Sequence, residues 1–132
     1  MDDRDVIARF WGTPAGIPYA FNSLHKAGTK LLMGSDAPVA PLDPWLAISA
    51  AVFGTESSDR EPFQPEQCLD FETALASSTA VGRVALRDAD AADLVLLDCD
   101  PSIIDSPEAM RAMPEHVLGT MLAGRWTYQQ AE

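Results

Sequence analysis

The stretch Lys30-Leu-Leu-Met-Gly-Ser-Asp-Ala-Pro38 decides how the rest of the chain is interpreted. Its apolar run, 30–33, comes directly before Gly-Ser-Asp, and this order predicts a buried strand that ends in a functional loop. On the N-terminal side, apolar residues recur at helical spacing over 19–27 and stop at Gly28, which predicts a helix. A helix followed by a buried strand indicates the α/β class.

Two further helices are expected on the C-terminal side of this strand. Pro44 opens the almost uniformly apolar segment Trp45–Phe53, which predicts a helix buried on more than one face. Asp43 is placed to cap this helix. Asp70 is placed to cap another helix that runs to Ser78.

The last fifty residues change in character and predict a small β-unit. Ala92–Asp98 contains consecutive apolar residues without alternation, which predicts a strand buried on both faces. A short helix is expected over 106–113. The segments 116–122 and 125–128 flank Ala123-Gly124, and this pattern predicts a β-hairpin with a two-residue turn.

Composition excludes several classes of protein. The 132 residues include 9 basic and 20 acidic side chains, for a net charge of -11, and 47% are hydrophobic. The apolar content excludes a disordered acidic tail, and the acidic charge argues against nucleic acid or an anionic membrane surface as a partner. No apolar run approaches the roughly 18–20 residues of a membrane span. The acidic start, Met1–Asp5, lacks the pattern of a secretion signal, so a cytoplasmic location is expected.

The order of the motifs resembles the C-terminal portion of the metal-dependent amidohydrolase superfamily, and within it the amidohydrolase-3 branch. Each matching string is weak by itself, but five of them in the family's order make a specific signal over about 19–128. The strings are Phe21–Val39, Pro41–Trp45, Phe71–Leu75 with Thr79, Ala92–Pro101 and Thr120–Tyr128.

This resemblance implies an incomplete α/β fold. Members of the superfamily are similar in combining a TIM-barrel-like domain with a β-sandwich built from both chain ends. Residues 1–80 would then be the C-terminal fragment of the metal-dependent hydrolase barrel, holding its last strand and helices. Residues 81–132 would form a portion of the composite β-sandwich. Because a complete barrel takes about 200–250 residues, this sequence has room for only a piece of one.

The resemblance also implies a catalytic role for Asp36. In the family, the matching carboxylate contacts the metal and accepts the proton of the water that attacks the substrate. A bound divalent cation lowers the pKa of that water, and a carboxylate within reach takes its proton. Spacing alone favours an Asx-turn or a helix cap for Asp36, whereas the order of the motifs favours the catalytic role. Asp43 and Trp45 are candidates for the border of the substrate pocket.

One carboxylate does not make a metal site, which typically needs about three protein ligands. The family supplies a His-x-His pair that this sequence lacks, and neither His25 nor His116 stands at ligand-like spacing from another ligand-type residue. A divalent metal, with zinc as the first choice, is therefore expected in the complete enzyme and not in this fragment. Cys68 and Cys99 are interpreted as small packing residues, and the acidic residues of 88–105 as a solvated surface.

Two functions follow as hypotheses. The first is a fragment of a metal-dependent hydrolase that acts on carbon–nitrogen bonds other than peptide bonds in a small-molecule substrate, and that is inactive in isolation. The alternative is a non-catalytic oligomerising or binding module derived from an amidohydrolase. A barrel cut before its last strand leaves unpaired strand edges and exposed apolar surface. Self-association, or pairing with the missing barrel portion, is therefore expected.

Overall fold

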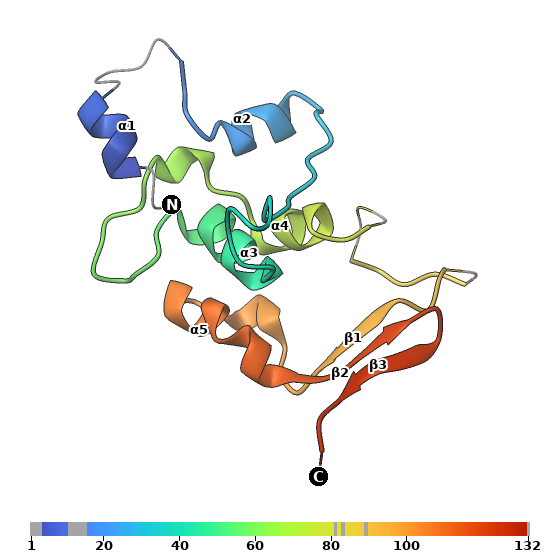
Figure 1. Ribbon diagram of the computed structural model, residues 1–132. Coiled ribbons are helices and arrows are strands. Elements are labelled where there is room, and N and C mark those ends of the chain that lie inside the picture. Colours follow the sequence, from blue (N-terminus) through green and yellow to red (C-terminus); the bar gives the residue numbers. More distant parts are fainter. Residues whose placement is uncertain (1–3, 11–15, 81, 83, 89, 132) are drawn as a thin grey trace.

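The computed structural model describes residues 4–10, 16–80, 82, 84–88 and 90–131, and it combines short helices with one small sheet (Figure 1). The helices are α1 (Arg4–Phe10), α2 (Phe21–Lys26), α3 (Pro44–Phe53), α4 (Phe71–Ser77) and α5 (Pro107–Arg111), with the shorter 3-10 helices η1 (Pro65–Gln67), η2 (Pro101–Ile103) and η3 (Met113–His116). The strands β1 (Leu94–Leu97), β2 (Val117–Leu122) and β3 (Arg125–Gln129) form an open antiparallel sheet in the order β1-β2-β3. The described chain is thus a mixed helix-and-strand structure.

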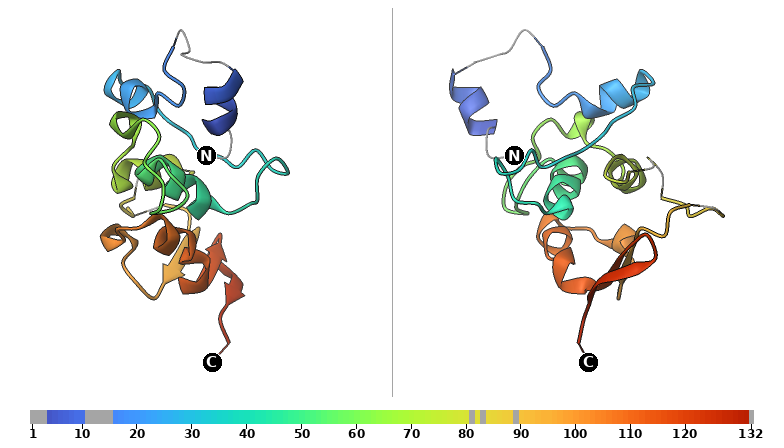
Figure 2. Two further views of the ribbon diagram at one scale, coloured as in Figure 1. Left: turned by 90° about the vertical axis from the view of Figure 1, so that its left-hand side faces the viewer. Right: turned by 45° about the vertical axis from the view of Figure 1, so that its right-hand side comes forward.

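Helix α3 organises the hydrophobic core, because it packs against both α4 and α5 (Figure 2). The Asp43 carboxylate accepts a hydrogen bond from the Trp45 N–H at 2.9 Å and caps the helix, which ends at Gly54 with a left-handed φ of 64°. The expected capped helix, buried on more than one face, is confirmed. The buried hydrophobic residues of the core are Trp45, Ile48, Ala51, Leu69, Ala74, Met110 and Met113.

The other expected helices are also confirmed. Helix α2 ends shortly before Gly28, whose φ of 84° is left-handed. Asp70 caps α4 by accepting a hydrogen bond from the Thr73 N–H at 2.7 Å. Helix α5 lies within the expected range 106–113 and is capped by the Ser106 hydroxyl.

The strand expected over 30–33 is wrong for this chain. The segment has no strand, and the Met33 N–H donates instead to the Ser77 carbonyl oxygen at 2.9 Å. Leu32 is 70% exposed. A strand needs a neighbour to pair its backbone groups, and within the described ranges the sheet contains only β1, β2 and β3. The apolar run therefore has no strand ladder: Leu32 is exposed, while Leu31 and Met33 are partly buried and pack against the core.

The predicted hairpin is confirmed. Strands β2 and β3 are joined by Ala123 and Gly124, whose φ values of 48° and 75° are both left-handed, as a two-residue hairpin turn of type I′ requires. Gly119 of β2 is needed for a close approach, because a Cβ there would lie 2.7 Å from the Trp126 ring of β3.

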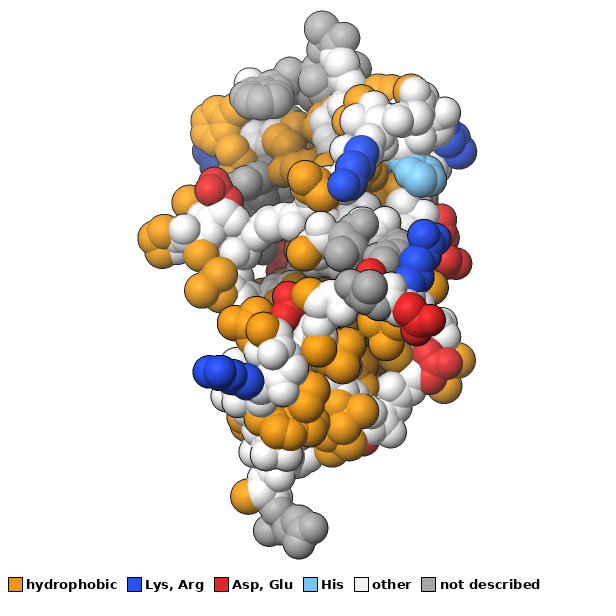
Figure 3. Space-filling view, turned by 90° about the vertical axis from the view of Figure 1, so that its right-hand side faces the viewer, with side chains coloured by type: hydrophobic (Ala, Val, Ile, Leu, Met, Phe, Trp, Pro, Cys, Tyr) orange, Lys and Arg blue, Asp and Glu red, His pale blue; other side chains and the backbone are white. Residues whose placement is uncertain are grey.

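The prediction that the strand over 92–98 is buried on both faces is wrong. Val95 and Leu96 are 59% and 52% exposed. Strand β1 is at the edge of the sheet, and no second sheet covers it among the residues described. Figure 3 shows hydrophobic side chains gathered on the lower part of one face, where the sheet lies. No helix in the described part of the chain is long and apolar enough to cross a membrane.

Candidate functional site

Asp36 lies on the exposed surface, in the turn that follows the apolar run 30–33. Its φ of 53° is left-handed, a conformation that Asp adopts more readily than most residues. Its carbonyl oxygen accepts a hydrogen bond from the Val39 N–H at 2.9 Å. The backbone of Asp36 therefore serves a turn, while the side chain is not needed for the core.

The structure separates the two candidate residues for a substrate pocket. Asp43 lines two small neighbouring cavities of about 230 and 240 Å³, and Gly34 and Ser35 line both of them as well. Trp45 is only 8% exposed and belongs to the core. Asp43 thus caps α3 and also lines the surface beside Gly34 and Ser35, whereas Trp45 is a core residue that lines neither cavity.

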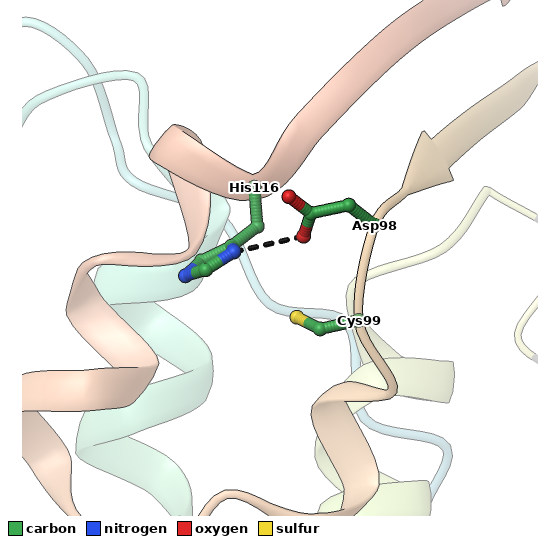
Figure 4. Close-up of side chains that lie close together, drawn as sticks. All are labelled: Asp98, Cys99 and His116. Carbon is green, nitrogen blue, oxygen red and sulfur yellow. Dashed lines mark hydrogen bonds and ion pairs between the residues drawn. The ribbon is translucent and has the colours of Figure 1, made fainter.

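A second group of candidate side chains lies where β1 and β2 adjoin. Asp98, Cys99 and His116 each offer one ligand atom, and these three atoms lie within 4.8 Å of one another (Figure 4). Asp98 Oδ1 and His116 Nδ1 are 2.8 Å apart. We call these three residues the Asp-Cys-His cluster. It is the single group of three or more ligand-type residues found within the described ranges.

The sheet explains why residues so distant in sequence meet. Leu97, the last residue of β1, pairs with Val117, the first residue of β2. The Asp98 N–H continues this pairing and donates to the His116 carbonyl oxygen at 3.1 Å. The residues just after β1 and just before β2 therefore face each other, which brings the Asp-Cys-His cluster together.

The surroundings of Cys99 oppose a role as a nucleophile. Desolvation raises the pKa of its thiol, and the nearby charges of Asp98 and Asp100 raise it further. A raised pKa reduces the thiolate fraction at neutral pH. In Figure 4 the His116 ring nitrogen nearer to Cys99 is Nδ1, and this nitrogen forms a hydrogen bond with Asp98. The other ring nitrogen, Nε2, lies on the far side of the imidazole. The group is therefore not arranged as a Cys–His nucleophile pair.

The structure also corrects the expectation about His116. In the sequence His116 does not stand at ligand-like spacing from another His, Cys or paired carboxylate, but the fold brings Asp98 and Cys99 within reach of its ring. The packing role expected of Cys99 is confirmed. Its Sγ lies 3.8 Å from the Sδ of Met113, and the side chain packs against the core. A usable signal was present: if the strand 92–98 pairs antiparallel with the strand 116–122, their adjoining ends must meet.

Comparison with known proteins defines the class of this chain. The model of the Amidohydrolase family matches residues 2–128, so the chain belongs to that family and has a hydrolase-family origin, as the order of its motifs indicates. A similar protein is Protein LONG AFTER FAR-RED 3 of Arabidopsis thaliana, which is 27% identical over 139 residues. That alignment covers 97% of this chain and 23% of the relative, so the chain spans about a quarter of the relative's length. No solved structure matches.

The residues present do not by themselves build a metal site around Asp36. Proteins of this family are typically metal-dependent. Within the described ranges, however, no group of three ligand-type side chains includes Asp36. The Asp-Cys-His cluster lies at the junction of β1 and β2 and does not contain it.

Proposed function

We propose that this chain is the C-terminal portion of an amidohydrolase that hydrolyses carbon–nitrogen bonds other than peptide bonds in a small-molecule substrate. The single observation that carries the proposal is the family match over residues 2–128. Residues 1–80 would complete the barrel of the metal-dependent hydrolase, and residues 81–132 would contribute to its β-sandwich. The whole enzyme is proposed to be cytoplasmic.

Asp36 is proposed as the catalytic carboxylate that this chain supplies. Its exposed position in a left-handed turn supports this role, because the side chain is not committed to the core. A carboxylate of this kind takes a proton from the attacking water when the two lie within hydrogen-bond reach. The remaining ligands of a divalent metal, with zinc as the first choice, would come from residues outside this chain. The isolated chain is therefore proposed to be inactive.

Exposed apolar surface supports pairing with the missing barrel portion. Leu32, Val39 and Leu42 flank the Asp36 turn and are 70%, 82% and 86% exposed. Burial of apolar area is the main favourable term in protein association. The segment 30–33 also lacks a strand partner in the described chain, and a barrel strand beside it would satisfy its backbone groups.

A non-catalytic module is the second candidate. The same exposed apolar side chains favour it, together with Val95 and Leu96 on the edge strand β1. A sheet edge with apolar side chains is a template for pairing with another chain. In this alternative the chain associates with further copies of itself or with a partner, and Asp36 has no catalytic role.

The upstream reading frame and the oligomeric state separate these candidates, and an activity assay tests the proposed inactivity. The coding sequence upstream of Met1 is read first: an open reading frame that adds a His-x-His strand supports the hydrolase, and a stop codon with a separate promoter supports the module. The purified 132-residue chain is then assayed with a panel of amides, ureas and cyclic imides in the presence of zinc or manganese. No turnover is expected, and metal-dependent hydrolysis that equimolar metal supports would overturn the proposed inactivity. Light scattering that shows a monomer at high concentration would contradict the module.

A further inference from the structure

The Asp-Cys-His cluster combines three different donor atoms at a fixed place in the fold. A carboxylate oxygen, an imidazole nitrogen and a thiol sulfur lie within 4.8 Å of one another. Two of the three residues, Asp98 and His116, are also joined through their backbones, by the Asp98 N–H to the His116 carbonyl oxygen at 3.1 Å. The end of the β1–β2 ladder therefore holds the donors together before any ligand binds.

These donors match a borderline divalent metal. Zinc is bound in proteins by Cys sulfur, His nitrogen and carboxylate oxygen, most often in a tetrahedral arrangement. The bond lengths of such a site place its ligand atoms about 3.3–3.6 Å apart. The Asp98 Oδ1 to His116 Nδ1 distance of 2.8 Å needs to open by about half an ångström, and the sulfur needs to move by about 1.5 Å at most. Small side-chain rotations supply both movements.

Exposure and charge also suit a cation. The side chains of His116 and Asp98 are 43% and 45% exposed, which leaves a route for the metal and room for a water ligand. Asp100 is close enough to act on Cys99 by its charge, so the surroundings are acidic. A thiolate and a carboxylate together balance the two charges of the metal, with a neutral imidazole as the third ligand.

We propose that Asp98, Cys99 and His116 bind one divalent transition metal of the zinc type, with water in the fourth position. The site is in the small sheet and is separate from any metal that Asp36 contacts in a complete hydrolase. The metal would bridge the end of β1 to the start of β2. Its role is to stabilise this junction, and it requires no catalytic step.

Cobalt(II) provides the direct test, because a thiolate ligand gives a sulfur-to-cobalt charge-transfer absorption that oxygen and nitrogen ligands do not. The reduced, metal-free chain is titrated with cobalt, and zinc is then added to displace it. One equivalent is expected to bind with the charge-transfer band, and zinc is expected to remove the band. Absence of the band at saturating cobalt would overturn the proposal.

Matched variants locate the site. Cys99→Ser and His116→Gln are each expected to weaken metal binding by at least about tenfold. The controls Cys68→Ser and His25→Gln change the same residue types elsewhere, and Asp36→Asn changes the proposed catalytic carboxylate. All three controls are expected to bind cobalt as the parent does. Loss of the band in Cys68→Ser, or its persistence in Cys99→Ser, would contradict the assignment.

A further measurement on the unaltered chain does not depend on the folding of any variant. Alkylation of each cysteine by iodoacetamide is followed by peptide mass spectrometry, with and without zinc. Zinc is expected to slow the alkylation of Cys99 and to leave that of Cys68 unchanged. Equal rates at Cys99 with and without zinc would overturn the proposal. Failure of this site would leave the hydrolase proposal intact, since the two share no residue.

Discussion

Asp98 and His116 form an ion-pair geometry across the end of the β1–β2 ladder, with Oδ1 and Nδ1 2.8 Å apart and the two backbones hydrogen-bonded beside them. Both side chains are nearly half exposed, and a pair of this kind contributes about 0.2–1 kcal/mol to stability. The pair by itself therefore contributes little to the stability of the fold. The pair matters because Cys99 lies beside it, so that three ligand-type groups come together.

Zinc is expected to stabilise the folded chain through this group. A ligand that binds only the folded state at about 100 times its Kd adds about 2.7 kcal/mol to the free energy of unfolding. Urea unfolding with and without zinc measures this difference. Cys99→Ser is expected to lose the increase, while Cys68→Ser keeps it. An equal increase in both variants would place the metal elsewhere.

Acid is expected to weaken the contact between Glu108 and Ser58. The Glu108 carboxylate accepts hydrogen bonds from the Ser58 N–H at 2.6 Å and from its hydroxyl at 2.7 Å. These bonds lower the pKa of Glu108 from 4.5 to about 2. Because the folded pKa lies below the unfolded one, the contribution is fully present above about pH 4.5 and is lost as the pH falls toward 2.

Glu108→Gln removes this titration. Its unfolding free energy is expected to be lower than that of the parent at pH 7, and the difference is expected to shrink between pH 4.5 and 2. Ser58→Ala, which keeps the N–H donor, is expected to produce a smaller change in the same direction. Urea unfolding over this pH range measures both. A difference that stays constant with pH would contradict the account.

The cap of α3 is expected to contribute measurably to stability. Asp43→Ala removes the acceptor of the Trp45 N–H and is expected to cost about 1 kcal/mol. Asp43→Asn keeps a capping oxygen and is expected to cost much less. Thermal unfolding followed by circular dichroism compares the two. Equal losses would show that the charge of Asp43, and not its cap, is what matters.

Gly119 is expected to resist substitution because of the Trp126 ring. A Cβ at this position would lie 2.7 Å from a ring carbon, so Gly119→Ala is expected to cost about 1–3 kcal/mol. Gly16→Ala is the control, because a Cβ there meets no atom within 4 Å. Urea unfolding of both variants and the parent measures these losses. A loss in the control as large as that in Gly119→Ala would contradict this explanation.

Local signals in the sequence predicted much of the fold correctly. Asp43 with Pro44, and Asp70 three residues before Thr73, define helix starts through contacts within one turn. The Ala123-Gly124 turn likewise depends only on its own backbone conformation. Such features are decided by neighbouring residues, and a single sequence contains them in full.

Features that depend on distant partners were predicted less well. The apolar run 30–33 needed a neighbouring strand, and Val95 and Leu96 needed a covering layer; the described chain provides neither. The Asp-Cys-His cluster was missed for the converse reason. Its members are separated in sequence, and only the register of β1 with β2 brings them together. The role of Asp36 is a third case, because the proposed metal site needs further ligands that are proposed to lie outside this chain.

The most direct test of the central claim is the rate of amide hydrolysis in the protein extended by its upstream coding sequence, compared between the parent and Asp36→Asn. Loss of a general base typically costs about 10²–10⁴-fold in rate. We expect metal-dependent hydrolysis in the extended parent and a fall of at least about 100-fold in Asp36→Asn, with folding unchanged by circular dichroism. Equal rates in the parent and in Asp36→Asn would contradict the account.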